Sequence, residues 1–220
     1  MKVPDGLITA ENVRSALDAE LEGAPRLLPR NIVDLAISQR RDEVARWVFA
    51  QISGKFTPSP EEVISASKSR SGIRPVAIWD LPSRILYRII VDRLSACLRK
   101  PERSTEAWRA FQREPLTKHG QYVVTADLAS CYSMIDHSLL AEELILQTGD
   151  WRAVEVLITL LREISGRSYG LPQQSTASDI LAENFLDRIE RALLRRGISA
   201  TRYNDDFRFL CQSWSDVVRS

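Results

Sequence analysis

The feature that most constrains the fold is a pair of adjacent acids, Asp205 and Asp206, between two short apolar runs. The surrounding sequence is TRYNDDFRFLCQ, in which Phe207, Phe209 and Cys211 occupy alternate positions. Such alternation is typical of a strand with one buried face, and Asn and Asp are common turn residues. The run therefore predicts a β-hairpin whose turn carries both carboxylates.

Two adjacent carboxylates repel one another, and either water or a cation can offset that repulsion. A solvated turn and a divalent-metal site therefore both remain open for this stretch. A third acid, Asp127, ends the β-rich run YVVTADL. We expect that run to be buried, where a lone carboxylate is costly unless it is paired or bound to metal. By itself, Asp127 is better explained as a helix cap or a loop acid. If its strand lies beside the hairpin, three carboxylates converge and magnesium suits them, because no histidine or cysteine cluster is nearby.

The order of expected elements predicts an α+β fold with antiparallel sheets. Apolar spacing indicates helices between residues 10 and 53, a hairpin within 61–79 and a helix over 82–98. The strand that ends at Asp127 follows, and then come helices over about 137–147, 151–164 and 175–196. The acid-bearing hairpin is last. This order differs from the regular strand–helix alternation of a parallel sheet. The polar segment 99–111 is interpreted as a connection.

Composition sets broad limits on what the chain does. The 220 residues are 44% hydrophobic, which is enough for one large domain or two small ones. The net charge of +1 neither requires nor excludes a polyanionic partner. Three scattered cysteines predict reduced thiols, and no apolar run reaches the ~20 residues of a membrane span. We therefore expect a cytoplasmic protein with no membrane partner.

Four stretches, taken in order, carry a family resemblance. They are KSRSGIRPVAIWDLPSRILYR, VVTADLASCYSMIDH, GLPQQSTASDILAE and RYNDDF. They resemble the fingers motifs, motif A, motif B and the YxDD motif C of the reverse transcriptase family, in particular its bacterial group II intron, retron and phage-defence members. The YxDD motif alone is weak, but the ordered set over about residues 61–212 is specific.

The resemblance implies a right-hand polymerase fold and a reaction. It implies a helical N-terminal extension over residues 1–55, fingers over 56–120 and a palm over 121–220, with an antiparallel palm sheet backed by helices. It also implies RNA-directed DNA synthesis by nucleotidyl transfer, with two Mg²⁺ ions, dNTPs, an RNA template and a DNA or RNA primer. A dedicated noncoding RNA is a further partner that the resemblance allows.

The resemblance also assigns catalytic and metal-binding residues. Asp127 matches the motif A metal ligand, and the carbonyl of Leu128 matches the backbone oxygen that the family adds. Asp205 and Asp206 match the motif C pair, and Asp205 is expected to bridge both ions. Metal would then offset the repulsion between the paired acids.

Four further residues match nucleotide-binding positions. Tyr132, five residues after Asp127, matches the aromatic residue that lies under the sugar and excludes a 2′-hydroxyl. Gln173 matches the motif B glutamine, and Lys68 and Arg74 match cations that grip the triphosphate, a task that suits both side chains. The alternatives are an ordinary buried aromatic for Tyr132 and a solvated hairpin tip for the two cations.

Two departures from the family pattern stand out. Gln174 replaces the usual glycine after LPQ, where glycine permits close backbone approach or a positive φ. This replacement bears on the template or nucleotide pocket. The later palm motifs, the primer grip and the helical thumb do not follow motif C, so we expect a piece of a longer protein that by itself holds a duplex poorly.

Two other functions stay open beside the leading one. The same scaffold can extend without a template, or prime from a protein, in an antiviral role. A scaffold that binds RNA and has lost catalysis is the third reading, although the three acids argue against it.

Overall fold

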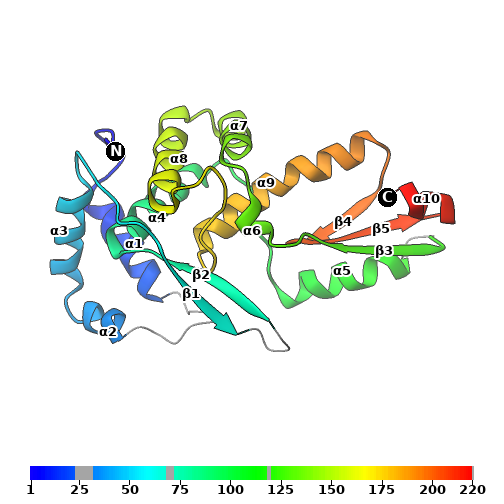
Figure 1. The fold of residues 1–220 in the computed structure, drawn as a ribbon, viewed down its shortest axis with the longest axis horizontal. Helices are drawn as coiled ribbons and strands as arrows, with labels where there is room; N and C mark the ends of the chain where they lie inside the picture. Colours follow the sequence, from blue (N-terminus) through cyan, green and yellow to red (C-terminus); the bar gives the residue numbers. More distant parts are fainter. Residues whose placement is uncertain (23–31, 68–71, 118–119, 220) are drawn as a thin grey trace.

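The computed structural model describes residues 1–22, 32–67, 72–117 and 120–219 and forms an elongated molecule (Figure 1). A helical part with a two-stranded hairpin occupies one end, and a three-stranded sheet occupies the other. The helices are α1 (Ala10–Glu22), α2 (Ile32–Ser38), α3 (Arg41–Ile52), α4 (Leu81–Leu94), α5 (Thr105–Thr117), α6 (Cys131–Met134), α7 (His137–Thr148), α8 (Trp151–Ser165), α9 (Thr176–Arg195) and α10 (Trp214–Arg219). The strands are β1 (Glu62–Ser67), β2 (Ile73–Ile78), β3 (Tyr122–Asp127), β4 (Ala200–Tyr203) and β5 (Asp206–Cys211).

The main hydrophobic core lies in the helical part, around α4 and α8. The side chain of Asp80 caps α4 by accepting a 2.8 Å hydrogen bond from the backbone N–H of Ser83, and a proline follows in the first turn. This is a favourable helix start. Helices α1 and α3 pack on α4 and share this core with α8. The N-terminal helices are thus packed onto the rest of the fold, while the boundary at residue 55 stays a prediction.

The sheet of β3, β5 and β4 is antiparallel, with β5 in the middle. Phe207, Phe209 and Cys211 form its buried face on β5, as their alternation predicts, and the C-terminal half of α9 covers them. A buried arginine on β4, Arg202, ties the sheet to that helix through ion pairs with Glu183, Asp187 and Glu190. The small core and these ion pairs position the end of the sheet that carries the acids.

Sequence and structure agree on the fold class and differ at three helices, one of which is the short α6 between β3 and α7. The predicted α+β fold with antiparallel sheets is confirmed. Helix α5 lies in the segment interpreted as a connection, and α10 was not expected. Helix α5 begins after Ser104, whose hydroxyl accepts a hydrogen bond from Ala107 N–H, and Trp108 and Phe111 pack against Tyr203 beside β4. Within the described residues, no helix is long and apolar enough to cross a membrane.

Candidate active site

Three acids meet at one end of the three-stranded sheet. Asp127, the last residue of β3, lies directly opposite Asp206, the first residue of β5, and Tyr203 of β4 lies opposite Asp206 on the other side. Directly opposed residues of an antiparallel pair project to the same face. Asp205 precedes Asp206 in the hairpin turn. The expected convergence of the two segments is therefore present, and α6 follows from the same end of the sheet (Figure 1).

The turn that holds Asp205 is a two-residue connection with a constrained backbone. Asn204 has a φ of 55°, a left-handed conformation that Asn tolerates better than most residues. The carbonyl of Asp205 accepts a 3.2 Å hydrogen bond from the backbone N–H of Leu128. This bond joins the turn to the chain just after Asp127, so the two acid-bearing segments are held in a fixed register.

The expectation that Asp127 is buried is wrong. Its side chain is exposed, because β3 is an edge strand and most of its residues face solvent. Asp205 and Asp206 are half-buried. Water therefore stabilises the Asp127 carboxylate, and burial alone does not call for a metal at this position.

A pKa shift nevertheless indicates that the three acids lie close enough to repel one another. Partial burial raises the pKa of Asp206, and the negative charges of Asp205 and Asp127 raise it further. Burial, followed by the charge of Asp205, raises the pKa of the nearby Cys131 thiol to about 11. Among the described residues, no three Asp, Glu, His or Cys side chains are gathered closely enough to enclose a metal ion. The carboxylates are neighbours whose donor chemistry fits Mg²⁺, and they do not form an assembled coordination shell.

Helix α6 connects the acids to the loop that precedes α9. The backbone N–H of Leu171 donates a 2.8 Å hydrogen bond to the carbonyl of Tyr132. The side-chain amide of Gln173 donates a 3.4 Å hydrogen bond to the hydroxyl of Ser133. Gln173 is thus brought to the short helix that carries Tyr132. This helix begins four residues after Asp127.

The family follows from a sequence comparison. A model of the family described as reverse transcriptase (RNA-dependent DNA polymerase) matches residues 66–220, which is more than half of the chain. The chain belongs to the reverse transcriptase family. The match includes the three acids, Tyr132 and Gln173.

Structural comparison gives weaker similarities for this reverse transcriptase chain. It is similar to a chain of a "Partial Cas6-RT-Cas1--Cas2 complex", with 20% identity, a TM-score of 0.45, and coverage of 97% of this chain and 39% of that chain. A chain of a "Cas6-RT-Cas1--Cas2 complex" gives the same identity and TM-score, with coverage of 97% and 24%. This chain thus spans well under half the length of either one. A search of curated proteins gives no match.

Gln174, the departure from the reverse transcriptase motif B, has a φ of 69°. This value lies in the left-handed region that glycine adopts freely and that L-residues adopt at a cost. The backbone therefore keeps the conformation that explains the usual glycine, and the Gln174 side chain is exposed rather than packed. Gln174 thus presents an exposed side chain beside Gln173, at a position where the backbone is left-handed.

A buried histidine holds the same loop against the chain after α6. The Nε2 of His137 donates a 2.7 Å hydrogen bond to the carbonyl of Gly170, and the N–H of Gly170 donates a 2.8 Å bond to the carbonyl of Ile135. Burial lowers the pKa of His137, and the Gly170 carbonyl partly opposes that shift. A neutral imidazole therefore fixes the loop that leads to Gln173.

The two expected triphosphate cations are on or beside the β1–β2 hairpin. Lys68 lies outside the described residues. Arg74 is half-buried on β2, opposite Ala66 of β1. Within the described residues, no hydrogen bond or ion pair joins Arg74 to the acids or to Gln173. Their assignment to the triphosphate stays a prediction.

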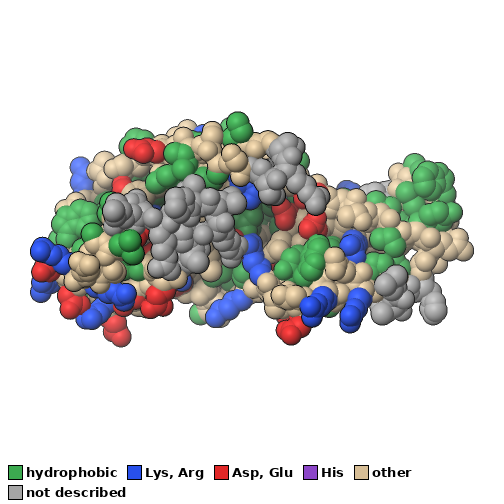
Figure 2. Space-filling model, turned by 90° about the horizontal axis from the view of Figure 1, so that it is seen from below, with side chains coloured by type: hydrophobic (Ala, Val, Ile, Leu, Met, Phe, Trp, Pro, Cys, Tyr) green, Lys and Arg blue, Asp and Glu red, His purple; other side chains and the backbone are tan. Residues whose placement is uncertain are grey.

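A small pocket separates the base of this hairpin from the loop before α9. It has a volume of about 80 Å³, and its lining includes Ala77 and Trp79 from the hairpin side and Ser133, Pro172 and Gln173 from the other side. On the face seen in Figure 2, acidic side chains gather near the middle of the molecule, with basic side chains on either side. The pocket shares Ser133 and Gln173 with the candidate site, and its lining does not include the three acids.

Proposed function

We propose that this chain is the fingers and part of the palm of an RNA-directed DNA polymerase that adds dNTPs to a primer 3′-hydroxyl on an RNA template. Family membership gives the reaction class. The observation that carries the proposal for this chain is the register of the sheet, in which Asp127 lies opposite Asp206 and beside the Asp205 turn.

The acids have distinct tasks in this proposal. Asp127, Asp205 and Asp206 supply carboxylate oxygens for two Mg²⁺ ions, with the Leu128 carbonyl as an additional ligand. When bound, such ions neutralise charge on the triphosphate and activate the primer hydroxyl. The raised pKa of Asp206 supports this assignment, because a cation would relieve the repulsion that causes it. The hydrogen bond between Leu128 and Asp205 keeps the ligands in register.

Four other residues bind the nucleotide in this proposal. Tyr132 lies against the sugar, and Gln173 lies beside the incoming nucleotide, supported by its hydrogen bond to Ser133. Lys68 and Arg74 contact the triphosphate from the hairpin. Arg74 suits bidentate contact with phosphate oxygens, and lysine acts as a point charge.

Primer extension tests the proposal. The complete natural protein is incubated with Mg²⁺, dNTPs and a primed RNA template, next to Asp205→Asn and a control, Asp5→Asn, which changes an exposed acid outside the site. We expect template-copied DNA from the unaltered protein and from the control, and none from Asp205→Asn.

The other outcomes identify the competing functions. Product whose sequence ignores the template, and which Asp205→Asn also loses, would replace the proposal with template-independent or protein-primed synthesis. A folded protein that binds RNA and makes no product would replace it with a binding scaffold. Equal synthesis by Asp205→Asn would contradict the role of the acids.

A further inference from the structure

The hydroxyl of Tyr132 is held by two charged residues from distant parts of the chain. Arg103, in the loop before α5, donates a 2.6 Å hydrogen bond to the Tyr132 oxygen. That oxygen donates its own proton to Oδ1 of Asp179, on α9, at 2.7 Å. Arg103 also forms a 2.9 Å ion pair with the same carboxylate oxygen. The three side chains therefore close a triangle of short polar contacts, which we call the tyrosine latch.

The latch is set in a largely dry part of the molecule. The side chain of Asp179 is only 7% exposed and that of Arg103 is 26% exposed. Charge-assisted hydrogen bonds are stronger than neutral ones, and partial burial reduces competition from water. Burial and the charge of Asp179 raise the pKa of Tyr132, so the phenol remains protonated and keeps its donor. A swing of the Tyr132 side chain about its Cα–Cβ bond would move the hydroxyl and break two such bonds at once.

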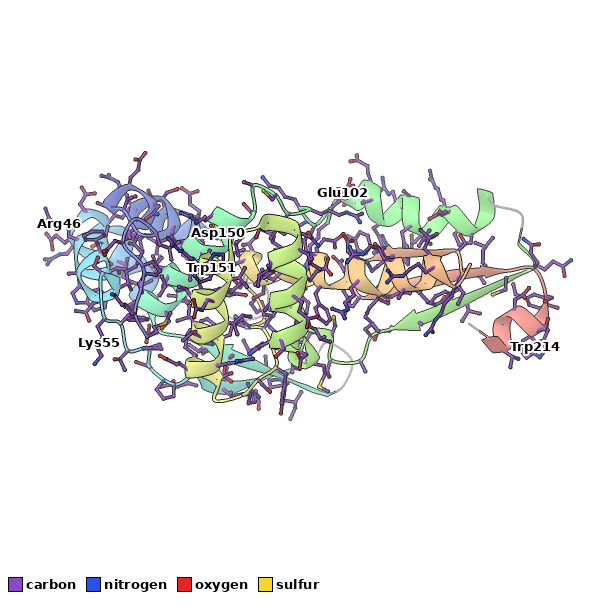
Figure 3. All side chains as sticks on the ribbon, turned by 90° about the horizontal axis from the view of Figure 1, so that it is seen from above. Arg46, Lys55, Glu102, Asp150, Trp151 and Trp214 are labelled. Atoms are coloured by element: carbon purple, nitrogen blue, oxygen red, sulfur yellow. The ribbon has the colours of Figure 1, made fainter. Side chains whose placement is uncertain are left out.

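The tyrosine latch connects three segments of the chain that are far apart in the sequence. Tyr132 is on α6, Asp179 is in the first turns of α9, and Arg103 is in the loop marked by the neighbouring Glu102 in Figure 3. The preceding residue on α9, Ser178, is also fixed, by a 2.9 Å hydrogen bond to the buried Tyr87 of α4. The position of Asp179 is thus anchored from its own helix, and the latch transmits that position to the tyrosine ring.

The two hydrogen bonds of the Tyr132 hydroxyl determine which part of this side chain meets a ligand. Its proton points to Asp179 and its oxygen already accepts from Arg103. Tyr132 therefore meets a ligand with its ring, and any discrimination between sugars depends on where that ring stands.

We propose that Arg103 and Asp179 are positioning residues that fix the ring of Tyr132 and thereby set the preference for deoxyribonucleotides over ribonucleotides. This inference rests on the proposed function, because it assumes that Tyr132 contacts the sugar of the incoming nucleotide. A ring that is free to move aside leaves room for a 2′-hydroxyl. Loss of the latch therefore raises ribonucleotide incorporation more than it lowers deoxyribonucleotide incorporation.

The experiment compares kcat/KM for dNTP and rNTP incorporation by the complete protein. Tyr132→Phe removes the hydroxyl and keeps the ring, so it is the variant least disturbing to the fold. We expect it to lower the dNTP/rNTP ratio by about threefold to tenfold. Asp179→Ala and Arg103→Ala should lower the ratio to a similar extent. The amide oxygen of Asp179→Asn can still accept a hydrogen bond from the hydroxyl. This variant should therefore keep a dNTP/rNTP ratio closer to that of the unaltered protein than Asp179→Ala does.

Two controls separate positioning from general damage. Combining Tyr132→Phe with Asp179→Ala should lower the ratio no further than either change alone, because both changes remove the same hydrogen bond. Arg188→Ala, at a position farther along α9, removes an exposed ion pair with Glu142 of α7 and should leave the ratio unchanged. Thermal unfolding of each variant confirms that it is folded.

The outcomes distinguish this inference from the function on which it rests. DNA synthesis with a ratio unmoved by Tyr132→Phe and Asp179→Ala would overturn the latch alone. An equal loss of dNTP and rNTP incorporation would show a merely structural role and would also overturn it. Failure of the unaltered protein to synthesise DNA would overturn the proposed function together with the inference.

Discussion

The two ends of this molecule are stabilised very differently. The helical part contains a core of 33 buried apolar residues, whereas the three-stranded sheet that carries the acids has a separate core of three, Phe207, Phe209 and Cys211, among the described residues. The acids lie on the weakly packed part, at the end closest to α6. Rigidity at the site therefore comes from hydrogen bonds and ion pairs, such as that between Leu128 and Asp205, more than from apolar burial. Changes in the two regions should separate activity from stability.

The largest expected effect is on activity at the sheet. Asp127→Asn removes a charge from an exposed strand end that contributes little to packing. We expect DNA synthesis to fall by about 10²–10³-fold, because metal-ion and electrostatic stabilisation supply several kcal/mol. The melting temperature should change by no more than about 2 °C. Primer extension and thermal unfolding of the same preparation measure both quantities, and a large loss of stability would contradict the separation.

The next effect is on stability in the helical core. Leu157→Ala, at a fully buried position of α8, should reduce the free energy of unfolding by about 2–5 kcal/mol. Val123→Ala, on β3 where the side chain is 47% exposed, should cost less than about 1 kcal/mol. Denaturant unfolding of the two variants tests the comparison. Equal losses would mean that the sheet is as strongly packed as the helices.

A smaller effect, with the opposite sign, is expected at the motif B loop. Gln174→Gly places glycine at a φ of 69° and should stabilise the protein by about 0.5–1 kcal/mol, because the strain of an L-residue there is larger than the added entropy of the unfolded chain. Gln173→Gly, at a neighbouring position without positive φ, is the matched change and should destabilise. A loss of stability in Gln174→Gly would show that the exposed side chain makes a contribution of its own.

The smallest effect is a pH dependence at His137. Its pKa is lowered by burial, so the folded state binds a proton less readily than the unfolded chain. The associated stability is fully present above the unfolded pKa of about 6.5 and is lost as pH falls through the lower folded pKa. His137→Asn should therefore flatten the decline in melting temperature between about pH 6.5 and 5. An unchanged decline in His137→Asn would contradict the assignment.

Sequence patterns predicted the elements with clear periodicity. The alternation at Phe207, Phe209 and Cys211 correctly identified the buried face of β5. The acid pair correctly located the hairpin, but its turn is formed by Asn204 and Asp205, and Asp206 is the first residue of β5. Helix α5 was missed because its sequence is polar and contains Pro115, and its apolar contacts are to a distant strand. A serine at position 104, followed by Trp108 and Phe111 three residues apart, was the available signal.

The sequence motifs predicted the residues of the candidate site, but not the residues that hold them in position. Asp127 was identified, but its burial was misjudged because the strand order that makes β3 an edge is a tertiary property. Arg103 and Asp179 were not singled out, since each is ordinary by itself and they lie 29 and 47 positions from Tyr132. Only the tertiary arrangement of α6, α9 and the loop before α5 brings them together. The reason for the usual glycine at position 174 was predicted, and the positive φ there agrees with it.

The central claim is that Asp127, Asp205 and Asp206 form one metal-binding site, and iron-directed cleavage tests it without requiring activity. Fe²⁺ binds oxygen sites similar to those of Mg²⁺, and with ascorbate and peroxide it cuts the backbone next to the bound ion. We predict two cuts, near residues 127–128 and near 205–206, which excess Mg²⁺ suppresses and Asp205→Asn abolishes while Asp5→Asn does not. Cleavage at neither position, or cuts that persist in Asp205→Asn, would contradict the claim.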